Sequence, residues 1–312
     1  DSSTSMKMAP VLAFALPSLV FQAIDVTIQS IDRVILLHLT DLSSLGVYDV
    51  LLGALFLMSF VALAISTSLY PVLTNVRLGL AGIEDGGQEM GRVVAALLRY
   101  VMILLLPISI IVSLNSGPVL DMLFGSAYAN FPNASLSFSI LIVSYALWGA
   151  TYALHSVLRS MGEARFFVVV GLAVIAFEIL GCWYLTQWLG LLGSALIRAV
   201  YILLLFLTAL GRTRQRGVSG LSSVLVSVLR IASVSLLSGM LVAFIAPTDA
   251  FGLLFWLALA FLLFIVMLFA VREINELDFR LLKSLVPKSM HGVIDRVSRL
   301  YFRSSGDSRP EV

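Results

Sequence analysis

The chain has 312 residues, of which 60% are hydrophobic and 12% are charged, and its mean hydropathy is +1.02. Soluble domains carry about 25% charged residues, so this composition excludes an ordinary soluble domain and predicts an all-α integral membrane protein with several spans. The net charge of +2 and the single cysteine, Cys182, give no indication of a nucleic-acid partner, an intramolecular disulfide or a metal site.

Apolar runs of roughly 20 residues, the length that crosses a bilayer core, recur along the chain. We expect about eight transmembrane helices packed as a bundle. Lipid cannot form hydrogen bonds with the backbone, and apart from a closed barrel only a helix satisfies its own backbone groups. They fall at residues 10–39, 47–73, 93–114, 136–158, 166–189, 191–210, 224–246 and 251–271.

The positions of lysine and arginine predict how these helices are oriented. With the amino terminus in the cytoplasm, every lysine and arginine except Arg33 and Arg198 falls on the cytoplasmic side. Cytoplasmic connections are enriched in these residues, so we expect a multi-pass plasma-membrane protein with both termini in the cytoplasm. After residue 271 the chain becomes basic, with apolar residues at helical spacing, which predicts an amphipathic helix on the inner membrane surface or else a solvated tail.

One face of the first predicted helix is polar. Its polar side chains follow one another at intervals of three or four residues, which places them on one side of a helix: Ser18, Gln22, Asp25, Gln29 and Asp32. Charge inside a span costs about 2.5–3.5 kcal/mol on insertion scales, so each case needs a reason. The stripe predicts either a translocation pathway or polar packing between helices, and its two carboxylates favour the pathway.

Two further charges lie inside predicted spans. Glu178 precedes the tight turn between the fifth and sixth helices, and Arg198 follows it at a similar distance. Because the helix rises by about 1.5 Å per residue, the two residues lie at similar depth on antiparallel neighbours, and we expect them to pair. The pair either holds the hairpin together as a structural salt bridge or binds a substrate or an ion.

The fourth predicted helix carries His155 close to Tyr145, Trp148 and Tyr152. The histidine is either packed in the bundle or part of the pathway. The sequence contains no phosphate-binding loop, no spaced cluster of metal ligands and no nucleophile with a plausible base. We therefore expect no cofactor, no metal and no enzymatic active site.

Five regions of the sequence resemble motifs in the carboxy-terminal half of polysaccharide flippases, which belong to the multidrug/oligosaccharidyl-lipid/polysaccharide exporter superfamily. The first is an Asp-Arg-hydrophobic run followed by Gly-Val-Tyr at 31–48, and the second is a helix end that contains Tyr-Pro at 68–73. The others are a Leu-Phe-Gly segment that ends in Tyr at 120–128, a loop with Gly-Glu-Ala-Arg at 158–165 and a helix start with Gly-Leu-Leu-Gly at 189–195. Their order and helix positions make the resemblance specific. Arg198 departs from it, because a small or neutral residue is expected there, and this departure predicts a different headgroup preference.

The resemblance implies a domain organisation. Residues 1–212 would form the second six-helix transport lobe, residues 213–271 an additional transmembrane hairpin, and residues 272–312 a basic amphipathic cytoplasmic tail. Since these flippases have two lobes and this sequence begins at Asp1 rather than at Met, we expect an amino-terminal lobe that the sequence does not contain.

The resemblance also implies a function: translocation of lipid-linked oligosaccharide across the plasma membrane by alternating access between two lobes. Residues expected to line the substrate pathway are Ser18, Gln22, Gln29, Asp32, Arg33, His155 and Arg198, with the arginines facing phosphate. Asp25 and Glu178 are the candidates for binding a coupling proton or sodium ion. The expected partners are the lipid-linked glycan, membrane lipids and the missing lobe.

Two other classes remain open. An ion-coupled multidrug or cation antiporter of the same superfamily would share this topology, and only a transport assay separates the two. A membrane glycosyltransferase or ligase usually has a sizeable catalytic region outside the membrane, whereas the outer connections predicted here are short.

Overall fold

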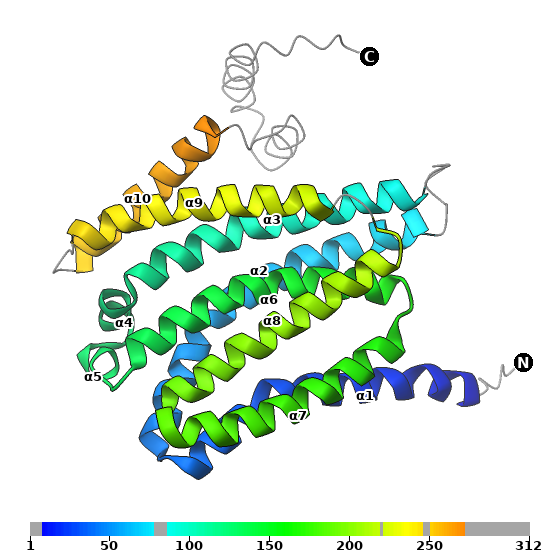
Figure 1. Cartoon of the computed structure of the whole chain (residues 1–312), viewed down its shortest axis with the longest axis horizontal. Coiled ribbons are helices and arrows are strands. Elements are labelled where there is room, and N and C mark those ends of the chain that lie inside the picture. The colour runs from blue at the N-terminus through cyan, green and yellow to red at the C-terminus, as the bar shows by residue number, and fades with distance from the viewer. Residues whose placement is uncertain (1–7, 78–85, 219–220, 246–249, 272–312) are drawn as a thin grey trace, which may run out of the picture.

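The computed structural model describes residues 8–77, 86–218, 221–245 and 250–271, and in these residues the chain is helical throughout, without strands (Figure 1). This confirms the predicted all-α polytopic bundle. The helices are α1 (Met8–Leu39), α2 (Leu42–Arg77), α3 (Gly86–Leu114), α4 (Ser116–Phe124), α5 (Ser126–Ala129), α6 (Ala134–Ser160), α7 (Ala164–Leu189), α8 (Leu191–Gln215), α9 (Leu221–Ile245) and α10 (Ala250–Ala270).

Eight of these helices are long, and within the described residues seven are long and apolar enough to cross a membrane. The exception is α1, which covers the first expected span but is not among the seven. The connection between the third and fourth expected spans contains two short helices, α4 and α5, that the hydropathy pattern did not predict. The expected amphipathic tail at 272–312 lies outside the described residues.

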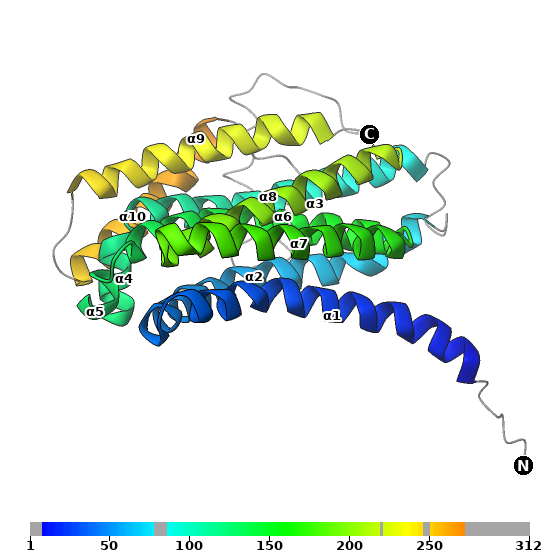
Figure 2. The ribbon, with the colours of Figure 1, turned by 60° about the horizontal axis from the view of Figure 1, so that its bottom comes forward.

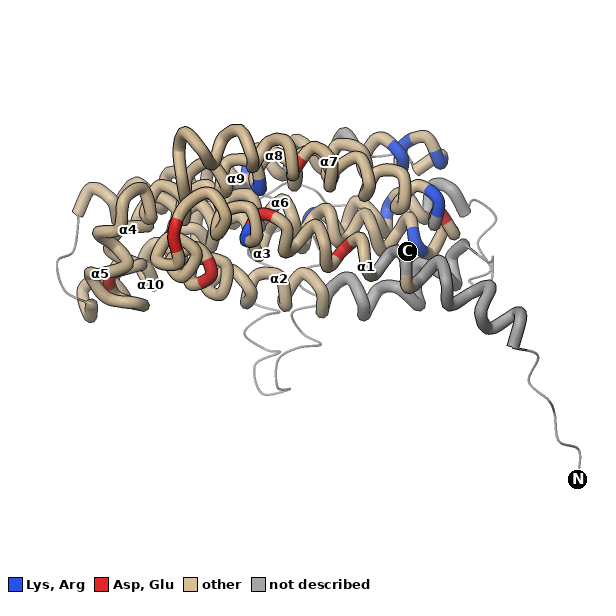
Figure 3. Tube along the Cα trace, turned by 90° about the horizontal axis from the view of Figure 1, so that it is seen from below, with Lys and Arg blue, Asp and Glu red and all other residues tan. Residues whose placement is uncertain are grey.

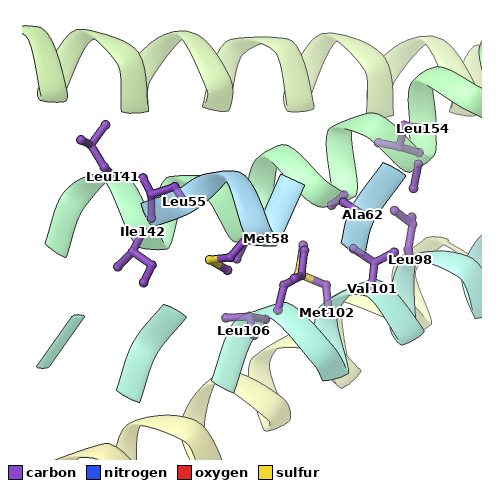
Figure 4. Packing of buried hydrophobic residues seen from close by; sticks show 14 of the residues in the cluster. Leu55, Met58, Ala62, Leu98, Val101, Met102, Leu106, Leu141, Ile142 and Leu154 are labelled. Carbon is purple, nitrogen blue, oxygen red and sulfur yellow. The ribbon is translucent and has the colours of Figure 1, made fainter. Parts of the chain in front are cut away.

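Helix α6 is the central helix of the bundle, and it packs against α2, α3 and α8. Figure 4 shows where α2, α3 and α6 meet, with Leu55, Met102 and Leu154 among the buried side chains. Gly149 permits this close packing, because a Cβ atom at that position would lie 2.3 Å from Leu105 Cδ1 and 3.2 Å from Ala62 Cβ. Interiors packed this densely leave no room for an added methyl group.

Two helix pairs flank this centre. Helix α1 packs along α7, while α9 packs along α3, and α1 and α9 lie on opposite sides of the bundle (Figure 2). The α7–α8 hairpin turns at Gly190, whose φ of 54° lies in the region that glycine adopts without strain. The hairpin therefore reverses direction almost without a loop, as the sequence predicted.

Basic residues gather at one end of the bundle, the end at which α1 begins (Figure 3). We call this the basic end. Here the buried carboxylate of Glu163, in the loop between α6 and α7, accepts hydrogen bonds from Arg212 at 2.8 and 3.1 Å and forms an ion pair with Arg216. These contacts tie the α6–α7 loop to the end of α8.

Candidate functional site

A polar cavity of about 220 Å³ lies between α1, α2, α6 and α8. Its charged and amide-bearing lining residues are Asp25, Gln29, Arg33 and Arg198, and its aromatic lining residues are Phe56, Phe60, Tyr145, Trp148, Tyr152 and Tyr201. Ligand pockets combine apolar and aromatic walls with a few polar groups, so this cavity is the candidate functional site.

A buried ion pair lies beside the cavity, because Arg198, which lines it, pairs with Asp32. Arg198 on α8 donates from Nε to Asp32 Oδ2 at 2.8 Å and from its NH2 group to Asp32 Oδ1 at 3.2 Å. The side chains of Arg198 and Asp32 are 3% and 0% exposed, so water does not solvate either charge. Burial makes such a pair depend on complete hydrogen bonding, because each unpaired charge would cost several kcal/mol.

The remaining bonds of this cluster come from four helices. The guanidinium of Arg198 also donates to the Tyr145 hydroxyl and to the Gln29 carbonyl oxygen, each at 2.9 Å. The Tyr48 hydroxyl donates to Asp32 Oδ2 at 2.5 Å. Because Tyr48 lies on α2 and Tyr145 on α6, one buried charge pair holds α1, α2, α6 and α8 together.

The expected pair between Glu178 and Arg198 is wrong. Arg198 pairs with Asp32, and Glu178 forms no ion pair or hydrogen bond with any residue that the structure describes. Matching the depth of two residues on neighbouring helices does not fix the direction in which each side chain points. Arg198 points toward α1 and α6, whereas Glu178 is fully buried on α7, close to Cys182.

The polar stripe of α1 divides into two parts in the structure. Asp25 and Gln29 line the cavity, and Gln29 Nε2 donates to Asp25 Oδ2 at 2.9 Å. Asp32 points inward to Arg198 instead. Ser18 and Gln22 lie in α1, but their side chains are outside the described residues.

Arg33 lies at the rim of the cavity and pairs with Asp49 on α2, with Nε and Oδ1 2.7 Å apart. The two side chains are 38% and 48% exposed. Exposed pairs contribute about 0–1 kcal/mol, so this contact positions Arg33 without fixing it strongly.

His155 lies apart from the large cavity. It packs edge-on against Phe167 with ring centroids 5.0 Å apart, and it lines a much smaller cavity of about 20 Å³ between α1, α6, α7 and α8. Asp25 lines both cavities. Of the residues expected in the pathway, the structure therefore brings Asp25, Gln29, Arg33 and Arg198 to one cavity and leaves His155 outside it.

The sequence reasoning missed Tyr48, Tyr201 and Asp49 as members of the site. Tyr48 belongs to the Gly-Val-Tyr motif, and Tyr201 follows Arg198 by three residues and therefore lies on the same face of α8. The Arg198 guanidinium lies 6.0 Å from the Tyr48 ring centroid and 5.9 Å from that of Tyr201. A search for aromatic residues one helical turn from each buried charge would have identified Tyr201.

Residues 3–132 match a family model described as "Polysaccharide biosynthesis protein". The match covers α1 to α5 and three of the five motif regions, and it confirms the resemblance to polysaccharide flippases over that part of the chain. Together with the seven apolar helices, it supports a polysaccharide-related transporter in a membrane. Searches of curated proteins and of solved structures find no match.

Proposed function

We propose that the chain is a cavity-bearing lobe of a flippase that moves lipid-linked oligosaccharide across the plasma membrane by alternating access. The observation that carries this proposal is the polar, aromatic-walled cavity inside a bundle of apolar helices. A sugar headgroup on a pyrophosphate cannot cross hydrocarbon unaided, because its polar groups would lose their hydrogen bonds to water. A polar cavity replaces these bonds while the lipid tail stays in the bilayer.

The lining chemistry suits a sugar headgroup. Asp25 accepts hydrogen bonds and Gln29 both donates and accepts them, and hydroxyl groups require this combination. Trp148 and Tyr152, whose ring centroids are 6.2 Å apart, present apolar rings with polar edges to the same space. The aliphatic face of a sugar ring would pack on these rings while its hydroxyls bond to Asp25 and Gln29.

The cavity volume supports a two-lobed carrier. At about 220 Å³ it lies below the roughly 300–1,000 Å³ that encloses a drug-sized ligand. An oligosaccharide would therefore be held between this wall and a second one. We propose that an amino-terminal lobe supplies the second wall, and that a proton or sodium ion bound at Asp25 or Glu178 couples its movement to an ion gradient.

The two arginines contribute differently to binding of an anionic headgroup. The charge of Arg198 is balanced by Asp32, and its guanidinium also donates to two further acceptors, so it attracts an anionic ligand only weakly. Arg33, at the exposed rim, can exchange Asp49 for a phosphate at small cost. We therefore assign phosphate contact to Arg33 and organisation of the cavity wall to Arg198.

A cation antiporter is the second candidate, because Asp25 lies beside aromatic side chains in the same cavity. A carboxylate with aromatic faces is also suited to an organic cation, which aromatic rings attract by about 0.5–2 kcal/mol. The two candidates differ in cargo, and transport of the wrong cargo would reject either one.

The experiment uses proteoliposomes that contain the chain together with the proposed amino-terminal lobe, and either a labelled lipid-linked oligosaccharide or, in parallel, a fluorescent organic cation. We expect glycan to become accessible to an impermeant lectin and Trp148→Ala to slow that appearance. Phe255→Ala is the matched control, because Phe255 lies on α10 and is 64% exposed. Cation movement without glycan movement would reject the flippase and favour the antiporter.

The orientation is tested separately by thiol labelling. Cys182 is fully buried and gives little background. A cysteine at Asp121, on α4, should react in intact cells with an impermeant maleimide, and a cysteine at Arg214, at the basic end, should not. Labelling of the Arg214 position alone would show that the basic end faces outward.

A further inference from the structure

Glu178 is the one carboxylate of the cluster for which the structure describes no partner. Its side chain is 0% exposed, and neither carboxyl oxygen has a hydrogen-bond partner among the described residues. Its surroundings are apolar, since Ile35, Cys182 and Ile197 form a buried cluster where α1, α7 and α8 meet. An ionised carboxylate without hydrogen bonds in such a place would cost many kcal/mol, so the group binds a proton instead.

The charges near Glu178 are already balanced. Asp32 and Arg198 are the charged groups that act on it most strongly, and they are bound to each other at 2.8 Å. With these two ionised, the cluster is neutral only if Glu178 holds its proton. Ionisation of Glu178 would leave two buried carboxylates to share one guanidinium.

Arg198 lies on the helix that packs against both of the helices that carry a buried carboxylate. Asp32 lies on α1 and Glu178 on α7, and both helices pack against α8, which carries Arg198. While the guanidinium bonds to Asp32, it ties α8 to α1. If it bonded to Glu178, it would tie α8 to α7 and release Asp32 and the Gln29 carbonyl oxygen beside the cavity.

We propose that Glu178 is a proton-binding site that exchanges its proton against Arg198. In one state the carboxyl group of Glu178 is protonated and Arg198 is bound to Asp32. In the other the O–H bond of Glu178 has broken, the proton has passed to water, Arg198 has moved from Asp32 to the Glu178 carboxylate, and water from the cavity hydrates the released Asp32 carboxylate. The proposal rests on the transport function only for its role in coupling, because the exchange links proton release to a change in the wall of the cavity.

Other titratable and charged groups lie near α7 or contact Arg198: Cys182 on α7, Asp25 and His38 on α1, Tyr48 on α2, Tyr145, His155 and Arg159 on α6, and Tyr201 on α8. The Tyr48 hydroxyl donates a hydrogen bond to Asp32, and the Tyr145 hydroxyl accepts one from Arg198. His38 stacks on Trp183 near the hairpin turn. Glu178 is the group whose ionisation changes the acceptor of Arg198.

The test is infrared spectroscopy of the full 312-residue chain in proteoliposomes, with the carbonyl stretch of a protonated carboxylic acid as the readout. At neutral pH the wild type should show this band, and Glu178→Gln should remove the part that belongs to Glu178. Glu163→Gln is the matched control, since Glu163 is also buried but is bound by Arg212 and Arg216 and is therefore ionised. A band unchanged by Glu178→Gln would overturn the proposal.

Two variants test the exchange itself. Asp32→Asn frees Arg198 for Glu178, so the Glu178 part of the band should be lost at neutral pH. Arg198→Gln removes the incoming cation, so this part should persist to higher pH than in the wild type, and this arm stands even if Asp32→Asn does not fold. A Glu178 band that keeps wild-type pH dependence in Arg198→Gln, or that survives in folded Asp32→Asn, would overturn the exchange. These readouts need neither cargo nor a second lobe. If the chain shows them but moves no glycan when it is combined with the amino-terminal lobe, the result would contradict the flippase and not the proton site.

Discussion

On one side of the bundle, α1, α7 and α8 bury the charged residues Asp32, Glu178 and Arg198, whereas α9 and α10 bury no charged side chain in their described residues. The polar groups that α9 does bury are hydroxyls that bond within the helix: Ser235 Oγ donates to the Ile231 carbonyl oxygen at 2.6 Å. Both regions lie in the same bundle and meet the same cost of burying polar groups.

The difference shows what packing alone requires. The contact between α3 and α9 is made by apolar side chains, by Gly239 and by serines that hydrogen-bond within their own helix, and it needs no buried ion pair. Replacing a buried ion pair by well-packed apolar residues is often neutral or stabilising, so stability does not explain why the cavity side has these charges. Their position beside the cavity supports a role in transport.

The largest expected effect comes from breaking the buried pair. Arg198→Met leaves Asp32 without its cation in a dry site, and we expect a loss of about 3–5 kcal/mol in the free energy of unfolding. The measurement is denaturant unfolding in detergent micelles. Arg33→Met is the matched control, because its pair is more than a third exposed and should cost only about 0–1 kcal/mol.

A double variant separates the charge effect from lost packing. Asp32→Asn combined with Arg198→Met removes both charges, so it should be more stable than Arg198→Met alone. Equal instability of the single and double variants would mean that Arg198 stabilises the bundle by its volume and not by its pairing with Asp32.

Two glycines allow the same comparison through packing. A Cβ atom on Gly193 would lie 2.4 Å from the Leu185 carbonyl oxygen, which is backbone and cannot rotate away. A Cβ atom on Gly239 would meet the flexible end of Leu114 at 2.8 Å and Ile111 Cα at 3.2 Å. We expect alanine at either position to cost about 1–3 kcal/mol, with Gly193→Ala near the upper limit, measured as thermal unfolding. A larger effect of Gly239→Ala would show that α9 is held more rigidly than the α7–α8 hairpin.

The effect of Asp25 should appear in transport and not in stability. Asp25→Asn keeps the shape and the contact with Gln29 but removes the titratable carboxylate that we propose binds a cation or proton. We expect near-normal abundance in the membrane and at least about a tenfold loss of gradient-driven glycan movement, equivalent to about 1.4 kcal/mol. The control is Asp121→Asn, at an exposed site outside this cavity. Gradient-driven transport at the wild-type rate by Asp25→Asn would exclude a coupling role and leave α1 as a passive wall.

The sequence predicted the helices well, because a bilayer imposes one simple rule on composition over long runs. The same rule did not predict α4 and α5, which are too short for a hydropathy window to detect. The polar stripe of α1 correctly pointed to Asp25 and Gln29 at one face, since helical spacing fixes which side chains share a side.

What the sequence did not predict was the partner of Arg198. Depth along a helix follows from counting residues, but the direction of a side chain depends on how each helix is rotated about its axis. Helix rotation is set by how side chains of different size fit between the helices, such as the close approach at Gly181, where a Cβ atom would lie 2.6 Å from Ile197 Cδ1. For the same reason, the involvement of Tyr48 could not be deduced from its place in a motif.

The smallest expected effect concerns Asp41, an exposed carboxylate in the corner between α1 and α2. Its Oδ1 atom accepts a hydrogen bond from the Ser44 backbone amide at 2.7 Å, so it caps the first turn of α2. Hydrogen bonds from the Ser44 hydroxyl and amide hold the pKa of Asp41 below its ordinary value. Because the folded-state pKa is lowered, the stabilisation is present above the unfolded value of about 3.9 and is lost as the pH falls through the folded value.

The exposed Asp41 carboxylate thus contrasts with the Asp32 carboxylate on α1, which is shielded from water. Amide hydrogen exchange over the first turn of α2 measures the effect. Asp41→Asn keeps a capping side chain that does not titrate, so it should match the wild type near neutral pH and exchange more slowly than the wild type in acid. Asp41→Ala lacks the cap and should exchange faster at every pH. If Asp41→Ala exchanged like the wild type near neutral pH, the capping bond would not stabilise α2, and the apolar packing of Val47 and Leu51 would hold the start of that helix alone.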